Sequence, residues 1–132
     1  MSDKVFELTY GQRGSSVNTD SLGMREMQAR VYKKRNSKKL LVKAPPASGK
    51  SRALMFIALD KLHNQGIKKA IIAVPERSIG KSFASVKLSD HGFPFDWYVK
   101  PENNLTTIGS DRSKVERFIK FMRSSDASDN VI

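Results

Sequence analysis

Two patterns of apolar and polar residues alternate along the chain, one typical of buried strands and the other of amphipathic helices. Short apolar runs occur at 39–43 (KLLVK) and 70–74 (AIIAV), and the second is apolar throughout, as in a strand covered on both faces. Between them, residues 50–63 have a helical pattern with apolar positions at Leu54, Ile57, Ala58 and Leu62. A strand, a helix and a second strand in this order predict an α/β fold with a parallel sheet.

Weaker patterns predict further elements on both sides of this unit. They are a strand at 4–10, a helix from about Asp20 or Ser21 to Arg35, a helix or turn at 79–86, a short strand at 97–99, a helix at 111–123 and the start of a strand at 130–132. The helix at 111–123 is expected to be capped by Asp111 and to pack through Val115, Phe118, Ile119 and Met122. We expect an N-terminal extension at 1–19 and one partial domain at 20–132.

The composition predicts a soluble, cytoplasmic protein without membrane contact. The chain has 132 residues, of which 39% are apolar, and no cysteine, so disulfides and cysteine-ligated metals are excluded. No apolar run reaches the length of a membrane span, and MSDKVFELTY lacks the apolar core of a signal peptide. His63 and His91 have no partner at metal-ligand spacing, so we expect both to be ordinary surface histidines.

Positive charge is concentrated in one stretch of a strongly basic chain. The net charge is +11, and residues 30–43 contain seven Lys or Arg and no Asp or Glu. Such a run attracts polyanions, of which nucleic acid is the usual one. The alternative is a solvated helix face followed by a turn. The aromatic residues Phe93, Phe95, Trp97 and Tyr98 could stack on bases, but core packing is the expected role of such a group.

The stretch APPASGKS, residues 44–51, lies between the first predicted strand and the helix that follows it. A strand, a loop ending in Gly-Lys-Ser and a helix form the arrangement of a phosphate-binding P-loop. The helix N-terminus offers unpaired N–H groups to an anion, and Gly49 lets the backbone approach it closely. Lys50 can reach the β- and γ-phosphates, and Ser51 can ligate the Mg²⁺ that bridges them.

Two features of this loop differ from an ideal phosphate loop. Pro45 and Pro46 have no N–H, so the backbone donors must come from Ala47 onward. Ala47 also lacks the conformational freedom that a glycine would give. The alternative interpretation of the stretch is a basic turn that binds no ligand.

The loop resembles motif I of superfamily 2 helicases and translocases of the DEAD/DEAH type, which often reads APTGSGKT. The chain has APPASGKS and departs from that form at Pro46 and Ala47. The resemblance covers about residues 20–88. It implies a P-loop NTPase of the RecA-like type, with a parallel sheet flanked by helices. The chain would be the N-terminal, incomplete part of the first motor domain of such an enzyme, similar to those of type III restriction systems.

Two further stretches resemble motifs of the same enzymes. IIAVPERS is similar to motif Ia, in which an apolar strand leads into Pro-Thr-Arg; Pro75 and Arg77 match, and Glu76 replaces Thr. MREMQARVY is similar to the segment that carries an adenine-reading glutamine, and Gln28 lies 22 residues before Lys50.

The resemblance implies a role for each matching residue. Gln28 would bind the adenine edge with its amide, and Arg25 would stack on the base or pair nearby. The phosphates would be held by Pro46, Ala47, Ser48, Gly49, Lys50 and Ser51, with Lys50 and Ser51 as the catalytic positions and Ser51 as the Mg²⁺ ligand. Arg77 and Ser78 would contact the backbone of DNA or RNA.

The implied function is the ATP-binding part of an enzyme that couples ATP hydrolysis to translocation on nucleic acid or its unwinding. Enzymes of this type use an Asp-Glu pair for Mg²⁺ and for the attacking water, and the chain contains no Asp-Glu pair. We therefore expect the chain alone to be inactive. Its expected partners are DNA or RNA, the rest of the motor with a second RecA-like domain, and a subunit of a restriction-modification system.

Two other functions are compatible with the sequence. One is a different P-loop enzyme, such as a small-molecule kinase, although the strand followed by Pro75 and Arg77 favours the helicase. The other is a basic nucleic-acid-binding module with a degenerate P-loop, whose binding would depend on salt and not on ATP or Lys50.

Overall fold

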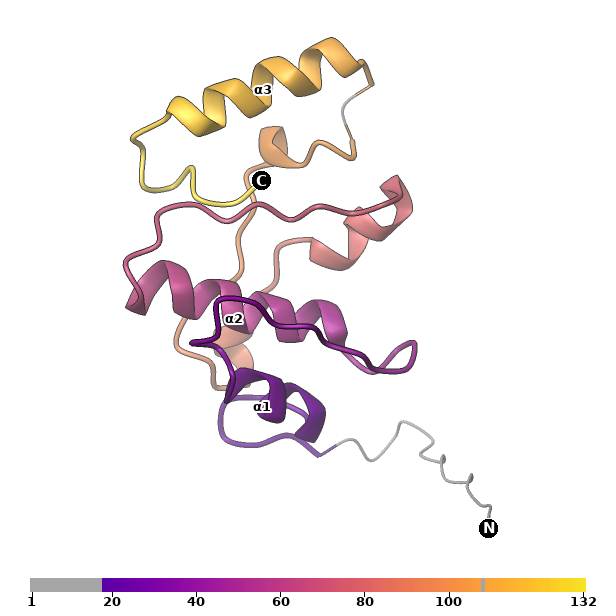
Figure 1. Cartoon of the computed structure of the whole chain (residues 1–132), viewed down its shortest axis with the longest axis vertical. Helices are drawn as coiled ribbons and strands as arrows, with labels where there is room; N and C mark the ends of the chain where they lie inside the picture. The colour runs from indigo at the N-terminus through magenta and orange to yellow at the C-terminus, as the bar shows by residue number, and fades with distance from the viewer. Residues whose placement is uncertain (1–17, 108) are drawn as a thin grey trace.

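Three α-helices and several short 3₁₀ helices make up the regular structure of the described residues. The computed structural model describes residues 18–107 and 109–132, so the strand predicted at 4–10 lies outside it. The elements are α1 (Glu26–Tyr32), α2 (Lys50–Asn64), η2 (Arg77–Phe83), η3 (Leu88–His91), η4 (Pro101–Asn103) and α3 (Asp111–Arg123). Figure 1 shows α1 and α3 at opposite ends of the molecule, with α2 between them.

Helix α2 forms where the sequence predicts a helix and lies at the centre of the fold. It begins directly after Gly49 and is buried along most of its length, through Ala53, Met55, Phe56, Ile57 and Leu59. Of the predicted apolar face, Ile57 is buried and Ala58 and Leu62 are partly buried, whereas Leu54 is 41% exposed. That face lines a cavity together with the extended segment 67–73, while Phe56 and Leu59 enter the main core. Because α2 has neighbours on two sides, one apolar stripe did not describe it.

The main core combines residues of α2 with the aromatic segment that follows η3. Its buried members are Met24, Met55, Phe56, Leu59, Leu88, Phe93, Trp97 and Val131. The indole N–H of Trp97 donates to the Phe83 carbonyl at 2.8 Å, which satisfies its one polar group. Core packing is thus confirmed for Phe93 and Trp97, whereas Tyr98 is 56% exposed. None of the described helices is both long and apolar enough to cross a membrane.

The predicted strand segments are extended, but the described residues pair only through isolated bridges. Ala70 pairs with Val131 in parallel, and the adjacent N–H of Ile72 donates to the Ile132 carbonyl at 2.9 Å. Val86 pairs with Trp97 in antiparallel orientation. Residues 40–43 make no backbone hydrogen bond to another described segment. The parallel sheet therefore stays a prediction, and the bridge between residues 70 and 131 has the orientation that it requires.

Helix α1 is shorter than the predicted helix from Asp20 or Ser21 to Arg35, so that prediction was wrong at both ends. The Asp20 carboxylate accepts from the N–H groups of Leu22 and Met24, at 2.9 and 3.0 Å. This local turn occupies the chain before the helix, as aspartate side chains often do. At the other end, the N–H groups of Lys34 and Arg35 donate to carbonyls three residues earlier, which tightens the chain into a turn.

Helix α3 has the predicted bounds but buries a different face. Phe121 is fully buried, whereas Val115, Ile119 and Met122 are 57%, 43% and 49% exposed, so the predicted packing stripe was wrong. Its cap is also different: the hydroxyl of Ser110, not Asp111, accepts from the Ser113 N–H at 3.2 Å. Helix α3 buries the side that carries Phe121 because of a residue one turn earlier, Arg117.

Arg117 binds a buried carboxylate, and this contact places the side of α3 that carries Arg117 and Phe121 against the rest of the fold. Its guanidinium donates to both oxygens of Asp129, at 2.8 and 3.1 Å, and to the side-chain amide oxygen of Asn103 at 2.7 Å. Asn103 in turn donates to Asp129 at 2.8 Å. The hydrogen bond from Asn103, together with the charge of Arg117, holds the pKa of Asp129 below its usual value although burial opposes this. The network joins α3, η4 and the segment before residue 131.

The substitution Asp129→Asn should destabilise the fold by on the order of 3 kcal/mol at pH 7, because it leaves the Arg117 charge without its partner. A carboxylate whose pKa is lowered by folding stabilises the fold above its unfolded pKa of about 4 and loses this effect as pH falls through the folded pKa. The difference between the two proteins should therefore shrink towards pH 2. Urea unfolding, followed by Trp97 fluorescence, measures it.

The control is Asp90→Asn, which removes a carboxylate whose side chain is 63% exposed. It should change stability by less than about 0.5 kcal/mol at both pH values. A deficit of Asp129→Asn that stays constant from pH 7 to pH 2 would contradict the role given to the Asp129 charge.

Candidate phosphate-binding site

The predicted phosphate loop opens into a cleft of about 850 Å³ between α1, the start of α2 and the end of η2. The cleft is lined by Thr19, Gly23, Arg25, Gln28, Ala47, Gly49, Lys50, Ser51, Arg52, Met55, Lys81, Ser82, Ala84, Ser85, Val86 and His91. Six of these were predicted as site residues: Arg25, Gln28, Ala47, Gly49, Lys50 and Ser51. The fold thus brings the two predicted parts, more than 20 residues apart, into one cavity.

The backbone at Gly49 has a conformation that favours glycine, with φ at +92°. A Cβ placed there would also lie 2.5 Å from the Gln28 side-chain nitrogen. The second constraint comes from the contact between the loop and α1. Ala47 has φ at +59°, a region that costs a non-glycine residue roughly 1–2 kcal/mol. The sequence-based expectation that alanine is unfavourable at this position is therefore confirmed.

Gln28 is the residue that holds the loop against α1. It is 3% exposed, and its side-chain amide donates to the Gly49 carbonyl at 3.0 Å. Its amide oxygen accepts from the Arg25 N–H at 2.8 Å, and the Arg25 guanidinium donates to the Ala47 carbonyl at 3.3 Å. Both ends of the Gln28 amide are thus bonded to backbone. Adenine recognition by Gln28 stays a prediction, and it requires these two bonds to be exchanged for bonds to a base.

Lys50 folds back over the loop that precedes it. Its ammonium group donates to the carbonyls of Ala44 and Pro45, at 2.7 and 3.1 Å. The charge is thereby held at the loop by neutral acceptors and not by a carboxylate. An anion that enters the loop would meet an unneutralised positive charge.

The electrostatics of the cleft favour an anionic ligand. Its described lining includes four Lys or Arg side chains and no Asp or Glu; the cations are Arg25, Lys50, Arg52 and Lys81. The N-terminus of the 15-residue helix α2 opens at the same place, with its unpaired N–H groups and positive dipole end. Within the loop, the hydroxyl oxygen of Ser48 is buried and lacks a hydrogen-bond partner. A phosphate group in the cleft would supply acceptors for the unpaired N–H groups at the start of α2.

The other predicted site residues lie outside this cleft. Pro46 and Ser48 belong to the loop but do not line the cavity, and the nucleic-acid candidates Arg77 and Ser78 lie at the exposed start of η2. The end of η2 lines the cleft instead, through Lys81 and Ser82, which the sequence reasoning missed. A signal was present, since residues 80–82 are a second Gly-Lys-Ser triplet in the chain.

Carboxylate ligands for a metal are not supplied by the described part of the cleft. No group of three or more His, Asp or Glu residues that could hold a metal ion occurs among the described residues. Ser51 is the lining residue with a hydroxyl at the start of α2. It fits a Mg²⁺ ion only as one ligand beside phosphate oxygens and water, which is how Mg²⁺ is usually bound with nucleotides.

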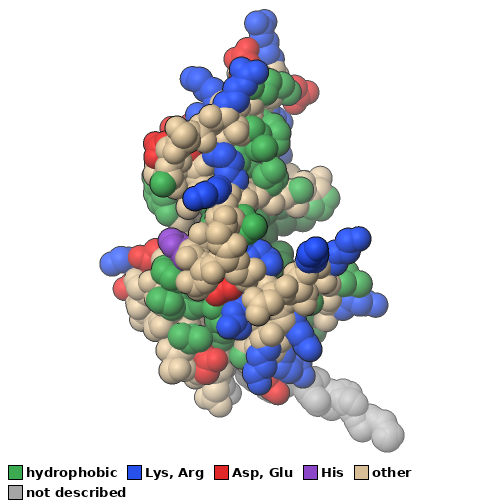
Figure 2. Space-filling view, turned by 60° about the vertical axis from the view of Figure 1, so that its left-hand side comes forward, with side chains coloured by type: hydrophobic (Ala, Val, Ile, Leu, Met, Phe, Trp, Pro, Cys, Tyr) green, Lys and Arg blue, Asp and Glu red, His purple; other side chains and the backbone are tan. Residues whose placement is uncertain are grey.

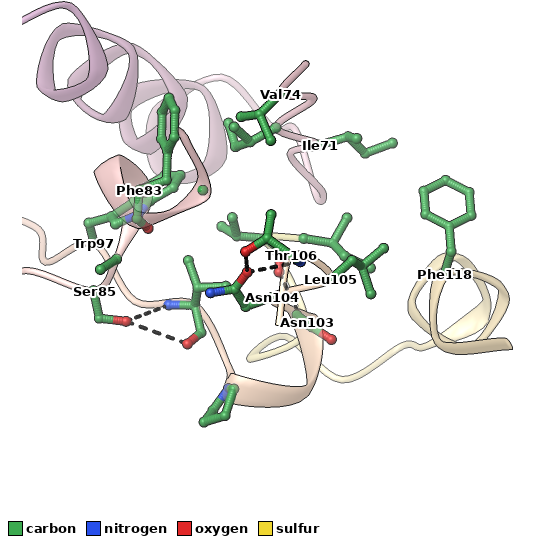
Figure 3. A pocket seen from close by; sticks show the side chains of 17 residues that line it. Ile71, Val74, Phe83, Ser85, Trp97, Asn103, Asn104, Leu105, Thr106 and Phe118 are labelled. Carbon is green, nitrogen blue, oxygen red and sulfur yellow. Dashed lines mark hydrogen bonds between the residues drawn. The ribbon is translucent and has the colours of Figure 1, made fainter. Parts of the chain in front are cut away.

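A second cavity, of about 320 Å³, has different chemistry. It lies between residues 71–74, η2, the segment 97–106 and α3, and no charged side chain of the described residues lines it. Figure 3 shows Val74, Phe83, Leu105 and Phe118 around it, with Asn104 and Thr106 bonded to each other. This cavity is apolar and does not fit a phosphate.

Comparison with known proteins adds one relative. The chain is similar to a named helicase. It is 60% identical, over 124 residues that make up 94% of the chain, to the curated Bacillus subtilis (strain 168) protein named "Putative ATP-dependent helicase YeeB". Those residues are 20% of that protein, so the chain spans about one fifth of the length of the curated relative it matches. No family model matches the chain, and no solved structure matches it.

The substitution Gly49→Ala should destabilise the fold by about 2 kcal/mol or more, since it adds backbone strain and a clash with Gln28. The matched control is Gly66→Ala, where φ is also positive (+72°) but no atom lies within 4 Å of the added Cβ. It should cost only the strain, roughly 1 kcal/mol. Chemical unfolding of both variants measures the difference.

A double-mutant cycle separates the clash from the strain. In a Gln28→Ala background, Gly49→Ala should cost no more than Gly66→Ala, because the side chain that it meets is gone. If the cost of Gly49→Ala were the same with and without Gln28, the contact between α1 and the loop would have no energetic role.

Proposed function

We propose that this chain is the ATP-binding part of an ATP-dependent helicase that acts on DNA or RNA. The observation that carries the proposal is the loop 44–51, which opens at the N-terminus of α2 into a cleft lined by cations. The similarity to a protein named as an ATP-dependent helicase supports the same function. The P-loop fold with a parallel sheet is part of this proposal.

In the proposed complex, the triphosphate lies over the loop. Lys50 exchanges its two carbonyl partners for β- and γ-phosphate oxygens, and the N–H groups from residue 47 onward donate to the phosphates. Ser51 supplies one oxygen to the Mg²⁺ bound with the nucleotide. The ion would neutralise charge that develops on the phosphates during transfer.

Hydrolysis is proposed to need residues beyond these 132. The chain has no Asp-Glu pair, and no carboxylate lines the described part of the cleft, so the group that orients the attacking water is missing. We therefore propose that the chain binds ATP without hydrolysing it at a useful rate. Purified chain that shows Mg²⁺-dependent turnover would contradict this.

Apolar surface on the described residues supports the proposal that further parts of a motor, including a second RecA-like domain, pack against them. Leu41 is 84% exposed and Ile71 is 53% exposed, each within an extended segment, and α3 exposes its predicted apolar stripe. Large exposed apolar patches are typical of surfaces that another chain or segment covers. Arg77 and Ser78, on the exposed start of η2, remain the proposed contacts for a nucleic-acid backbone.

The substitution Lys50→Ala should weaken ATP binding at least tenfold and leave the fold intact, because its ammonium group bonds only to carbonyls of its own loop. Isothermal titration of the intact chain with ATP and Mg²⁺ measures the affinity, and circular dichroism measures the fold. The control is Lys120→Ala, an exposed cation on α3. Equal affinities of the two variants would contradict a P-loop function and favour a nucleic-acid-binding module that does not use ATP.

A Gln28→Ala substitution separates two roles of that residue. The bonds to the Gly49 carbonyl and the Arg25 N–H predict that it positions the loop, so ATP and GTP binding should weaken by the same factor. A residue that recognises adenine would instead discriminate between the two nucleotides. Loss of ATP affinity with no change for GTP would therefore contradict the positioning role and establish adenine recognition.

A further inference from the structure

Residues 30–43, here called the basic segment, present positive charge that the nucleotide site does not use. Six of its seven cations are exposed: Arg30, Lys33, Lys34, Lys38, Lys39 and Lys43. Within the part of the chain that the structure describes, none of these six is paired with a carboxylate. Figure 2 shows Lys and Arg side chains over both the upper and the lower part of the face that it draws. The segment is therefore an unneutralised cationic surface.

The seventh cation, Arg35, turns inward and fixes the segment to α2. Its guanidinium lies 3.4 Å from the Asp60 carboxylate and 4.4 Å from the centre of the Tyr32 ring. The Arg35 carbonyl accepts from the Lys61 ammonium at 2.9 Å and from the Gln65 amide at 3.4 Å. Both the side chain and the backbone at this position are thus bonded to the C-terminal part of α2, so the turn is held in one conformation.

Asp60 is charged at neutral pH, which keeps this attachment intact. Burial by itself would raise the pKa of Asp60, but hydrogen bonds from Asn64 and Gln65 and the charge of Arg35 outweigh burial and lower the pKa. Those hydrogen bonds are 2.8 and 2.6 Å long. The attachment rests on this geometry of donors around one carboxylate.

A groove of about 230 Å³ runs along the basic segment between α1 and the extended residues 40–43. It is lined by three of the six exposed cations and by apolar side chains; the full set is Met27, Arg30, Val31, Lys34, Leu40, Leu41, Val42 and Lys43. Cations and exposed apolar side chains side by side, such as Lys43 and Leu41, suit a ligand with repeating phosphates and flat hydrophobic groups. A single-stranded nucleic acid has this composition.

We propose that the basic segment binds the phosphate backbone of single-stranded nucleic acid, at a surface separate from the phosphate loop and from Arg77 and Ser78. Six cations along 14 residues match a polyanion better than a small anion, which would need convergent donors. The fixed turn lowers the conformational cost of binding, because these side chains project from an ordered backbone. Binding at this surface does not depend on nucleotide at the loop.

The test compares two variants of the intact chain in which the same amount of positive charge is removed. In one, Lys33, Lys34, Lys38 and Lys39 are each changed to Gln; in the other, Lys87, Arg112, Lys120 and Arg123, exposed residues elsewhere, are each changed to Gln. Fluorescence anisotropy measures the affinity for a labelled 20-nucleotide oligo(dT) at several salt concentrations. Removing one ion pair between a lysine and a phosphate lowers the slope of log K against log salt by about 0.7.

The slope should fall by about 2 to 3 units in the first variant, and the second should keep the slope of the unchanged chain. An equal fall in both would show that only net charge matters and would overturn the proposal. The proposal would also be overturned if the unchanged chain showed no measurable binding at 50 mM salt. Displacement of the oligonucleotide by polyglutamate at equal charge would overturn it as well. Circular dichroism and the urea midpoint establish that both variants fold.

Lys50→Ala, measured in the same assay, keeps this test apart from the nucleotide site. It should leave the salt slope unchanged. A fall of about 0.7, the value for one lost ion pair, would mean that the phosphate loop itself holds the oligonucleotide, which would overturn a separate surface. Failure of ATP binding with an intact slope would count only against the ATP function.

Discussion

The polar contacts between α1 and the two ends of α2 hold in place both the phosphate-loop cleft and the basic segment. Near the start of α2, Gln28 donates to the Gly49 carbonyl; near its end, Asp60 accepts from Tyr32 and pairs with Arg35. One short helix is thereby fixed at two points to a helix of 15 residues, which is roughly 22 Å long. The phosphate loop lies beside the first point and the basic segment beside the second. Core packing between the helices is completed by edge-to-face contact of Tyr32 with Phe56.

Local signals in the sequence were enough for the elements that depend on neighbouring residues. The bounds of α2 and α3 follow from periodicity and from turn residues, and the loop 44–51 follows from its Gly-Lys-Ser ending between an apolar run and a helix. The strained alanine at position 47 was also predictable, because it occupies a place where glycine is favoured. These features need no knowledge of distant contacts.

Features that depend on distant partners were not predictable in this way. The face that α3 buries is set by Arg117 and Asp129, which pair across 12 residues of sequence and outweigh the apolar stripe. Helix α1 begins late because Asp20 forms its own turn. Lys81 reaches the cleft because η2 passes beside α2, and the Gly-Lys-Ser triplet at 80–82 does not by itself predict that approach. Most of the apolar stripe of α3 is exposed among the described residues. The side of α3 that is buried therefore could not be inferred from the periodicity of its apolar residues.

The lysine of the phosphate loop bonds to two carbonyls of the same loop, and this sets a threshold for the charge of a ligand. To bind Lys50, a ligand must displace the two carbonyls, which are strong neutral acceptors. Its net gain is therefore the free energy of its interaction with the ammonium group minus that of the two carbonyl hydrogen bonds. A singly charged anion gains little by this exchange in a cleft open to water. A triphosphate carries several charges close together and gains much more. In the proposed ATP complex, the loop would therefore select for charge density before any contact with the base is made.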